Sequence, residues 1–310
     1  MALKVVGYGI MVDDIVFPDG KTRMGLLGGG GPQTAWGAAA ATGDGTQAGL
    51  VAGVGNDLDA VDMRPLHNAN INMDGIRQTQ HPTPRAWQVL EWSGLRRHVW
   101  RVPVDTLDEQ LARGYDVLPA SYHDAAYFHW GIDPGNTTPD QNWTTGLITQ
   151  GGKVSIEPYQ PPPQPLSPEA LKELVSPLAL FTANQTEAEG ITGKTDNTDI
   201  IRAFREAGCD YLALRNGSLG SLVVDINSGE AVHVPAVPTD VVDVVGAGNA
   251  FNGALLITLE QGIAEAACYA SAAASYMIEQ VGMPLHLPDR DDFMRRVNFA
   301  RERREITRYD

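Results

Sequence analysis

Short apolar runs alternate with helix-like segments along most of the chain. Runs typical of buried strands lie at residues 3–6, 47–54, 127–129, 153–156, 178–182, 211–214 and 221–225. Helical patterns lie between several of them, at residues 34–41, 168–175, 187–192 and 200–207. This alternation predicts an α/β fold with a mostly parallel sheet covered by helices on both faces. The last third is predicted to be helical at 250–260 and 263–281, followed by a charged surface helix over 289–310.

One segment interrupts this alternation. Residues 85–90 and 96–102 flank a Ser93-Gly94 turn, and the whole segment 85–102 contains Trp87, Trp92 and Trp100. The pattern predicts an antiparallel hairpin outside the main sheet. Such a hairpin can be a lid over a site, a dimer contact, or an element that packs only on its own domain.

Length and charge narrow the classes of function. The 310 residues suffice for one large α/β domain or two small ones. The net charge of −15, from 23 basic and 38 acidic residues, argues against nonspecific binding to nucleic acid or to anionic membranes. Residues 1–12 are interpreted as one short apolar strand without a signal-peptide layout, and no apolar run approaches the roughly 20 residues of a membrane span. With two distant cysteines, Cys209 and Cys268, a cytoplasmic protein with reduced thiols is expected.

A glycine turn before a helix is the strongest chemical signal. Val241 and Val242 are interpreted as the end of a buried strand, and Gly246, Ala247 and Gly248 as a tight turn opening the helix at 250–260. Such a turn directs backbone N–H groups toward one point, which suits a phosphate or a developing oxyanion. The next residue is Asn249, which is isosteric with Asp but cannot accept a proton.

A second glycine run, residues 28–31, precedes an alanine-rich helix and allows a ligand to approach the backbone. It lacks the Gly-Lys-Ser/Thr of a Walker loop. The Gly246–Gly248 turn lacks the third glycine of a dinucleotide fingerprint, which disfavours an oxidoreductase.

Three further patterns have both a structural and a functional interpretation. Asn184 and Glu187 lie three residues apart at a predicted helix start, where they form a cap or hold hydrated Mg²⁺ beside phosphates. Asp13 and Asp14 are predicted to end an apolar strand, as turn-forming groups or as substrate ligands. Residues 216–220 form a hairpin turn or approach a nucleotide.

In their order along nearly the whole chain, these pieces resemble the PfkB, or ribokinase-like, family of carbohydrate kinases. Residues 28–35 resemble its N-terminal signature, with Gln33 in place of Asn, and residues 53–57 resemble its Gly-x-Gly-x-Asp turn. Residues 184–187 match its Asn-x-x-Glu motif. Gly217 and Gly220 match its Thr-x-Gly-x-x-Gly turn, with Arg215 in place of Thr. Residues 243–249 resemble Asp-Thr-x-Gly-Ala-Gly-Asp, with Val244 for Thr and Asn249 for the catalytic Asp, and residues 272–284 resemble the family's closing helix and loop.

The resemblance implies a single ribokinase-like domain over residues 1–310, a three-layer α/β sandwich with a small β-lid at about 14–25 and 83–104. It implies ATP and Mg²⁺ as cofactors, a sugar or nucleoside acceptor, and a homodimer through the lid as one use of the hairpin. Gly246, Ala247 and Gly248 would form the anion hole, and Asn249 would orient the acceptor. The acceptor would be bound by Asp14, in preference to Asp13, together with Gly28, Gly29 and Gln33. The nucleotide would be bound by Asn184, Glu187, Arg215, Gly217 and Gly220. Glu187 would hold Mg²⁺ through water, and Asp243 would serve a monovalent-cation site for K⁺.

Asn249 leaves three explanations open. The chain is a natural divergent kinase with a weakened base, a variant engineered to trap a substrate complex, or a nucleotide-binding pseudokinase with a regulatory or scaffold role. Loss of a general base costs about 10²–10⁴-fold in rate, while a loose phosphoryl-transfer transition state allows some turnover to survive.

Overall fold

The computed structural model describes residues 2–92, 96–136 and 138–309. Within them, ten strands form one sheet in the order β14-β13-β12-β11-β10-β9-β8-β1-β4-β5. The strands from β11 to β5 in this order pair in parallel, while β12, β13 and β14 add antiparallel pairs at the other edge. The strand bounds are β1 Val5–Tyr8, β4 Ala48–Val54, β5 Asn72–Gln78, β8 Tyr127–Ile132, β9 Lys153–Pro158, β10 Leu180–Asn184, β11 Tyr211–Arg215, β12 Ser221–Asp225, β13 Glu230–Val234 and β14 Glu305–Arg308.

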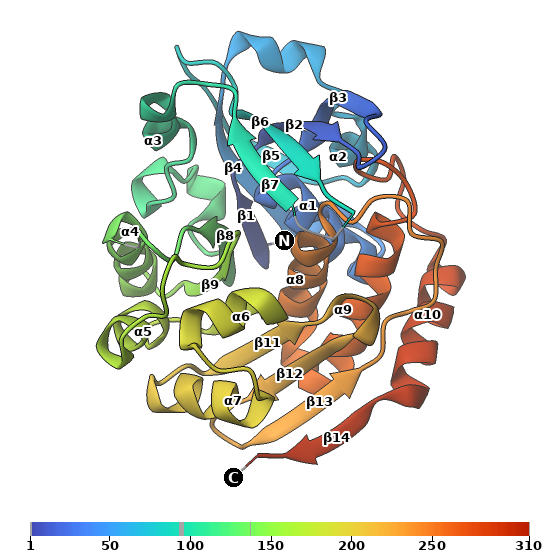
Figure 1. Ribbon diagram of the computed structural model, residues 1–310. Coiled ribbons are helices and arrows are strands. Elements are labelled where there is room, and N and C mark those ends of the chain that lie inside the picture. Colours follow the sequence, from blue (N-terminus) through green and yellow to red (C-terminus); the bar gives the residue numbers. More distant parts are fainter. Residues whose placement is uncertain (1, 93–95, 137, 310) are drawn as a thin grey trace.

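Helices cover both faces of this sheet, which gives three layers (Figure 1). Alternate strand residues face opposite layers, as the two-residue period of a strand requires: Leu180 packs with one buried cluster and Phe181 with the other. The first cluster lies under α1 Gly30–Thr42, α8 Ala247–Thr258, α9 Ile263–Met277 and α10 Arg290–Arg303. The second lies under α4 Thr138–Thr149, α5 Pro168–Val175, α6 Gln185–Thr192 and α7 Asn197–Glu206. The short helices are α2 Arg64–Asn68 and α3 Leu107–Gln110.

A separate four-stranded sheet lies beside the main one (Figure 1). Its order is β3-β2-β6-β7, from β2 Met11–Val16, β3 Thr22–Gly28, β6 Arg85–Leu90 and β7 Arg96–Trp100. The predicted antiparallel hairpin is confirmed as β6 and β7, and its Ser93-Gly94 turn lies outside the described residues. This second sheet is called the small sheet below.

Four expectations were wrong at the level of single elements. The apolar run at 1–12 is two strands in different sheets, because Gly9 adopts a φ of 87° and turns the chain. Asp13 and Asp14 therefore lie inside β2 and do not end a strand. Val241 and Val242 form no strand and are 60% and 52% exposed, and the Val242 N–H bonds the Ile278 carbonyl.

The fourth concerns the tail. Residues 289–310 are not one surface helix: α10 buries Phe293, Val297 and Ala300 against the first cluster. The chain then adds β14 to the edge of the sheet. None of the helices that the structure describes is long and apolar enough to cross a membrane.

Helices α1 and α8 touch backbone to backbone. A methyl group added at Gly253 would overlap the Thr34 carbonyl oxygen, and one at Gly37 would overlap the Ala250 carbonyl oxygen. Only glycine permits so close an approach, so this contact holds the two helices in one relative position. Helix α1 begins at Gly30, two residues after β3 of the small sheet ends, and α8 begins at Ala247.

We predict that Gly253→Ala lowers the free energy of unfolding by at least about 1–3 kcal/mol, the usual cost of overpacking. The matched control is Gly146→Ala in α4, where an added methyl meets nothing within 4 Å. That change should be neutral or stabilising by roughly 0.5–1 kcal/mol, because alanine favours helix over glycine. Urea denaturation measures both variants, and equal stabilities would contradict the close-contact explanation.

Candidate active site

Two glycine turns face each other where α1 and α8 begin. Gly29 (φ 91°) precedes α1, and Gly246 (φ 89°) precedes α8, and both angles favour glycine. Asn249 Oδ1 lies 3.6 Å from the position that a Cβ on Gly30 would take. At the start of α1 the Gly31 N–H donates to the Gly9 carbonyl oxygen and Pro32 has no N–H, and at the start of α8 the Ala247 N–H donates to the Val244 carbonyl oxygen. The N–H groups that follow in α8, together with the positive ends of both helix dipoles, make this region attractive to anions.

Asn249 is fixed by a second amide. Its Nδ2 donates to Gln33 Oε1 at 2.7 Å, and Gln33 is buried beneath Gly246. This bond uses one of the two Nδ2 hydrogens and orients the amide, so that Oδ1 faces the Gly30 side as an acceptor. Two of the four residues that depart from the motifs named above, Gln33 and Asn249, thus form a hydrogen-bonded pair across 216 positions of sequence.

The two neighbouring aspartates face different surroundings. Asp13 Oδ1 accepts from Gln88 Nε2 at 2.8 Å, and its other oxygen lies against Gly28, where any side chain would overlap it. Asp14 instead accepts from Arg85 at 2.6 and 2.8 Å, from Arg101, and from the Gly25 N–H. Neighbouring residues of a strand face opposite sides of the sheet, so Asp13 faces the glycine turn and Asp14 lies in an ion cluster on the other face of the small sheet. The sequence preference for Asp14 therefore has no support in this geometry.

Their pKa values move in opposite directions. Burial raises the pKa of Asp13 to about 7, against the opposing effect of the Gln88 hydrogen bond. Burial also acts to raise the pKa of Asp14, but hydrogen bonds from Arg85, the Gly25 N–H and Arg101 outweigh it and hold that pKa below its ordinary value.

Carboxyl ends of three parallel strands supply the other half of the site. Asn184 ends β10 and pairs in register with Arg215 at the end of β11, and Glu157 lies near the end of β9. Asn184 and Glu187 form a complete capping box on α6, with reciprocal bonds of 2.9 and 2.8 Å. Burial raises the pKa of Glu187. The motif therefore acts as a helix cap, which was its structural interpretation. The Glu187 carboxylate also lies 4.0 Å from the Arg215 guanidinium.

Arg215 lies on the glycine turn itself. Its Nη2 donates to Glu157 Oε2 at 2.9 Å, and its guanidinium fills the space that a side chain at Gly248 would need. Gly217 (φ 53°) and Gly220 (φ 93°) shape the turn that follows, between β11 and β12. Of these glycines, Gly217 has open space around its Cα.

Sequence reasoning missed a buried polar network beneath the turn. Asn252 Nδ2 donates to Glu157 Oε2 at 2.6 Å, and Asn252 Oδ1 accepts from Thr182 at 2.9 Å. His129 lies 3.3 Å from Asn252 and 3.0 Å from Ser155, and burial lowers its pKa to about 4. Two signals were available: Asn252 lies three residues after Asn249 on one helix, and Glu157 follows a buried strand run.

Two other contacts concern the edges of the site. Arg96 of β7 reaches the Tyr159 carbonyl oxygen at 3.5 Å, so the small sheet touches the main domain there.

Asp243 Oδ1 accepts from the Val245 N–H at 3.0 Å, while its buried Oδ2 has no hydrogen bond from any described residue. Burial raises the pKa of Asp243. No cluster of three or more His, Cys, Asp or Glu side chains able to hold a metal exists among the described residues.

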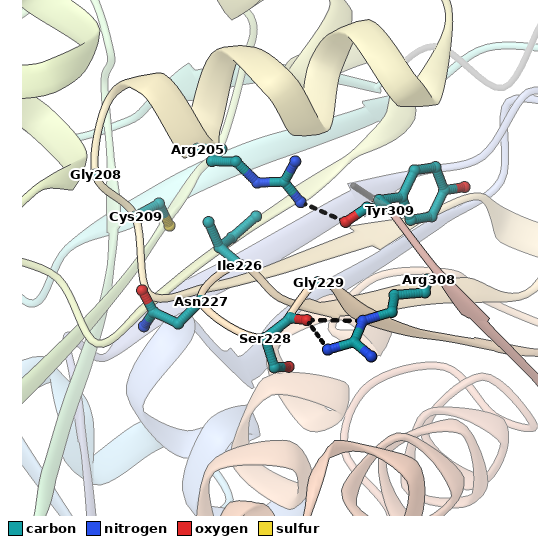
Figure 2. Close-up of a pocket in the computed structure, with 9 residues that line it drawn as sticks. All are labelled: Arg205, Gly208, Cys209, Ile226, Asn227, Ser228, Gly229, Arg308 and Tyr309. Carbon is teal, nitrogen blue, oxygen red and sulfur yellow. Dashed lines mark hydrogen bonds between the residues drawn. The ribbon is translucent and has the colours of Figure 1, made fainter.

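A cavity of about 630 Å³ lies elsewhere, at the amino end of β11 and beside β14 (Figure 2). Its two arginines bond backbone carbonyl oxygens: Arg205 that of Tyr309, and Arg308 that of Ser228. Figure 2 shows both contacts tying the C-terminal strand to its neighbours. Arg215 lies at the carboxyl end of β11 and the cavity lies at its amino end. The cavity is therefore separate from the glycine turns.

The family model described as pfkB family carbohydrate kinase matches residues 2–290. The chain belongs to the pfkB family of carbohydrate kinases. The resemblance drawn from the motifs is thus confirmed, and so is the ribokinase-like fold.

Individual pfkB relatives are distant. A cytidine kinase of Thermococcus kodakarensis is 27% identical over 262 residues, which cover 84% of this chain and 89% of the relative. Arabidopsis thaliana ribokinase, solved with ribose and ATP, has a TM-score of 0.70 at 19% identity and covers 96% of this chain and 100% of its own. A candidate ribokinase II from E. coli, solved with ATP and Mg²⁺, has a TM-score of 0.72 at 17% identity, with coverages of 96% and 99%.

We predict opposite pH effects on stability from the two aspartates. Because the folded-state pKa of Asp13 is raised to about 7, its stabilising contribution is present below the unfolded value of about 3.9 and is lost as pH rises through about 7. Asp13→Asn should therefore become increasingly stable relative to wild type between about pH 5 and pH 8, by the order of a few kcal/mol.

Asp14→Asn is the matched control. Its folded-state pKa is lowered, so its contribution exists above the unfolded pKa and is lost only in acid. That variant should be less stable than wild type at pH 8. Urea denaturation at pH 5 and pH 8 measures the free energy of unfolding of each variant relative to wild type. If both variants were stabilised, or both destabilised, at pH 8, the assignment of the two aspartates would be wrong.

Proposed function

We propose that this pfkB member transfers the γ-phosphoryl group of ATP to a hydroxyl of a sugar, a sugar-like molecule or a nucleoside. The observation that carries the proposal is the meeting of the Gly246–Gly248 turn with the Gly28–Gly30 turn, with Asn249 Oδ1 between them. One turn suits a phosphoryl group because its N–H groups are free. The other, beside Asp13, suits a polyhydroxylated acceptor.

The nucleotide would lie along the carboxyl ends of β9, β10 and β11, where α/β folds place their ligands. Arg215, Gly217 and Gly220 would border the phosphates. Glu187 is engaged by the cap, so it would hold Mg²⁺ through water, as this ion prefers. The E. coli and Arabidopsis structures described with ATP support this cofactor. The exposed side chains of Val241, Val242 and Val244 offer apolar surface for the base.

The acceptor would lie under the small sheet, which would act as the lid. Asp13, Gly28, Gly29 and Gln33 would line its site, and we assign Asp13 the role that sequence gave to Asp14. The cytidine kinase relative supports a nucleoside or sugar hydroxyl as the acceptor. Closure of the small sheet would exclude water, which protects ATP from hydrolysis. A homodimer through this sheet stays a prediction.

Asn249 would orient the acceptor without deprotonating it. Its free Oδ1 would accept the hydroxyl hydrogen, which directs the oxygen at the γ-phosphorus. The new O–P bond forms as the bond from the γ-phosphorus to the bridging oxygen of ADP breaks. The proton would leave late, onto an oxygen of the transferred phosphoryl group, which a loose transition state allows. Positioning and charge stabilisation would carry most of the catalysis.

The buried Asp243 Oδ2 fits a cation. A carboxylate oxygen without a partner is costly in the interior, and a monovalent ion such as K⁺ would satisfy it. The ion would supply positive charge behind the anion hole.

A pseudokinase with a regulatory or scaffold role is the second candidate. One observation favours it: Asn249 cannot accept a proton, and its amide is held by Gln33 in that state. In that case nucleotide would bind without turnover.

Calorimetry with ATP and Mg²⁺, then a turnover assay with a panel of sugars and nucleosides, separates these candidates. We expect a dissociation constant for the nucleotide below millimolar and measurable phosphorylation of at least one acceptor. Binding without turnover on every acceptor would favour the pseudokinase. No heat from folded protein at millimolar nucleotide would refute both.

For the kinase we predict that Asn249→Asp raises turnover roughly tenfold or more, because it restores a general base. Nucleotide affinity should change little, since the base acts in the transition state. Gln33 can rotate its amide and donate Nε2–H to the new carboxylate, so the fold should persist. Asn249→Ala, which removes the positioning oxygen, is the control and should lower turnover. Equal rates for the Asn and Asp forms would mean that another group takes the proton.

A further inference from the structure

We infer that Arg215 is a resident phosphate-binding cation of the anion hole, contacting the transferring phosphoryl group through the edge of its guanidinium that faces Gly248. The inference rests on the proposed function and names the group that compensates for Asn249. The resemblance to the family places Thr at this position, so the charge is a feature of this chain.

The location of the guanidinium is the first argument. It lies on the Gly248 backbone, where an added methyl would overlap Nη1. Gly248 adopts no positive φ, so its backbone would accept a side chain. Among neighbouring atoms within 4 Å of that position, the three nearest all belong to Arg215. Glycine at 248 therefore makes room for the arginine, on the turn that receives the phosphoryl group.

The anchoring of the guanidinium is the second argument. Glu157 holds Nη2 at 2.9 Å, and Asn252 in turn holds the same Glu157 oxygen at 2.6 Å. The side chain of Arg215 is 18% exposed, and its buried Nε–H donates to no residue that the structure describes. One edge is thus fixed while the rest of the planar group keeps unused donors, and an arginine presents such donors to phosphate as a rigid fork.

Magnitudes decide whether such a cation can compensate for a missing base. A general base contributes about 10²–10⁴-fold. In other phosphoryl-transfer enzymes, an arginine on the transferring group contributes about 10³–10⁵-fold. The charge effect is at least as large, so Asn249 and Arg215 together are compatible with turnover. Glu157 and Glu187 lie beside Arg215, and the Mg²⁺ that accompanies ATP would offset part of their negative charge.

The first test is a double-mutant cycle on folding, which needs no ligand. Gly248→Ala should lower the melting temperature because the methyl meets the guanidinium. Arg215→Thr should abolish most of that decrease, because threonine leaves the space open. Additive effects of the two changes would mean that the guanidinium does not occupy this position, and would overturn the inference.

The second test is calorimetry with ATP–Mg²⁺, ADP–Mg²⁺ and AMP. Arg215→Thr should weaken ATP binding at least tenfold and leave AMP binding unchanged, because only the terminal phosphates reach the turn. Arg215→Lys should bind ATP with an affinity between those of wild type and Arg215→Thr, because lysine keeps the positive charge but loses the paired donors of the guanidinium. Arg202→Thr, which removes an exposed arginine on α7 paired with Asp199, is the control for net charge and should bind as wild type does.

A buried carboxylate left without its cation can impair folding. The double variant Arg215→Thr with Glu157→Gln removes both charges, and glutamine can still accept from Asn252. It should fold and show the same selective loss of ATP binding. With an acceptor from the panel, its kcat should fall at least 10²-fold, while the KM for the acceptor stays unchanged.

The outcomes distinguish the two proposals. Wild-type protein that binds ATP, with Arg215→Thr binding it equally well, overturns the role of Arg215 and leaves the kinase proposal standing. Tighter ATP binding by Arg215→Thr would show that the guanidinium blocks the turn, which also overturns the inference. Failure of wild-type protein to bind any nucleotide refutes the proposed function and this inference together.

Discussion

The backbone contact between α1 and α8 is the constraint on which the site depends. Gly37 and Gly253 allow the two helices to approach until carbonyl oxygens of one meet the Cα atoms of the other. This approach brings the first turns of both helices together, and with them the positive ends of both helix dipoles. A larger residue at either glycine would move one helix, and the two glycine turns would no longer share one space.

Charge inside the site follows from a buried network beneath those turns. Thr182, Asn252 and Glu157 form a hydrogen-bonded chain that ends on the guanidinium of Arg215. Buried polar groups cost free energy unless they are paired, so such a chain stabilises the fold only as a complete set. Its completeness also holds the arginine in one place, which an exposed side chain could not achieve without losing conformational entropy.

The departures from the family signature are connected through the structure. Gln33 and Asn249 bond each other, and Arg215 fills the space beside Gly248 next to Asn249. An aspartate at 249 facing the present Gln33 carbonyl would bring two acceptors together, whereas the amide pair is satisfied. We interpret the substitutions as one coordinated change, in which proton acceptance is reduced and fixed positive charge is added.

The sequence by itself determined the layered fold, most of the strands and helices, the antiparallel hairpin and the family. The strands, helices and hairpin depend on patterns within short windows of about ten to twenty residues, and the layered fold and the family follow from the order of those patterns and motifs along the chain. Only the tertiary structure decided that Asp13 rather than Asp14 lies at the glycine turn, because the packing of the small sheet decides which face of β2 is turned toward it. It also decided that residues 241–242 are exposed, that the tail adds an edge strand, and that Glu157 and Asn252 support Arg215. Each of these outcomes depends on contacts between residues far apart in the sequence, and no local pattern of a single chain contains that information.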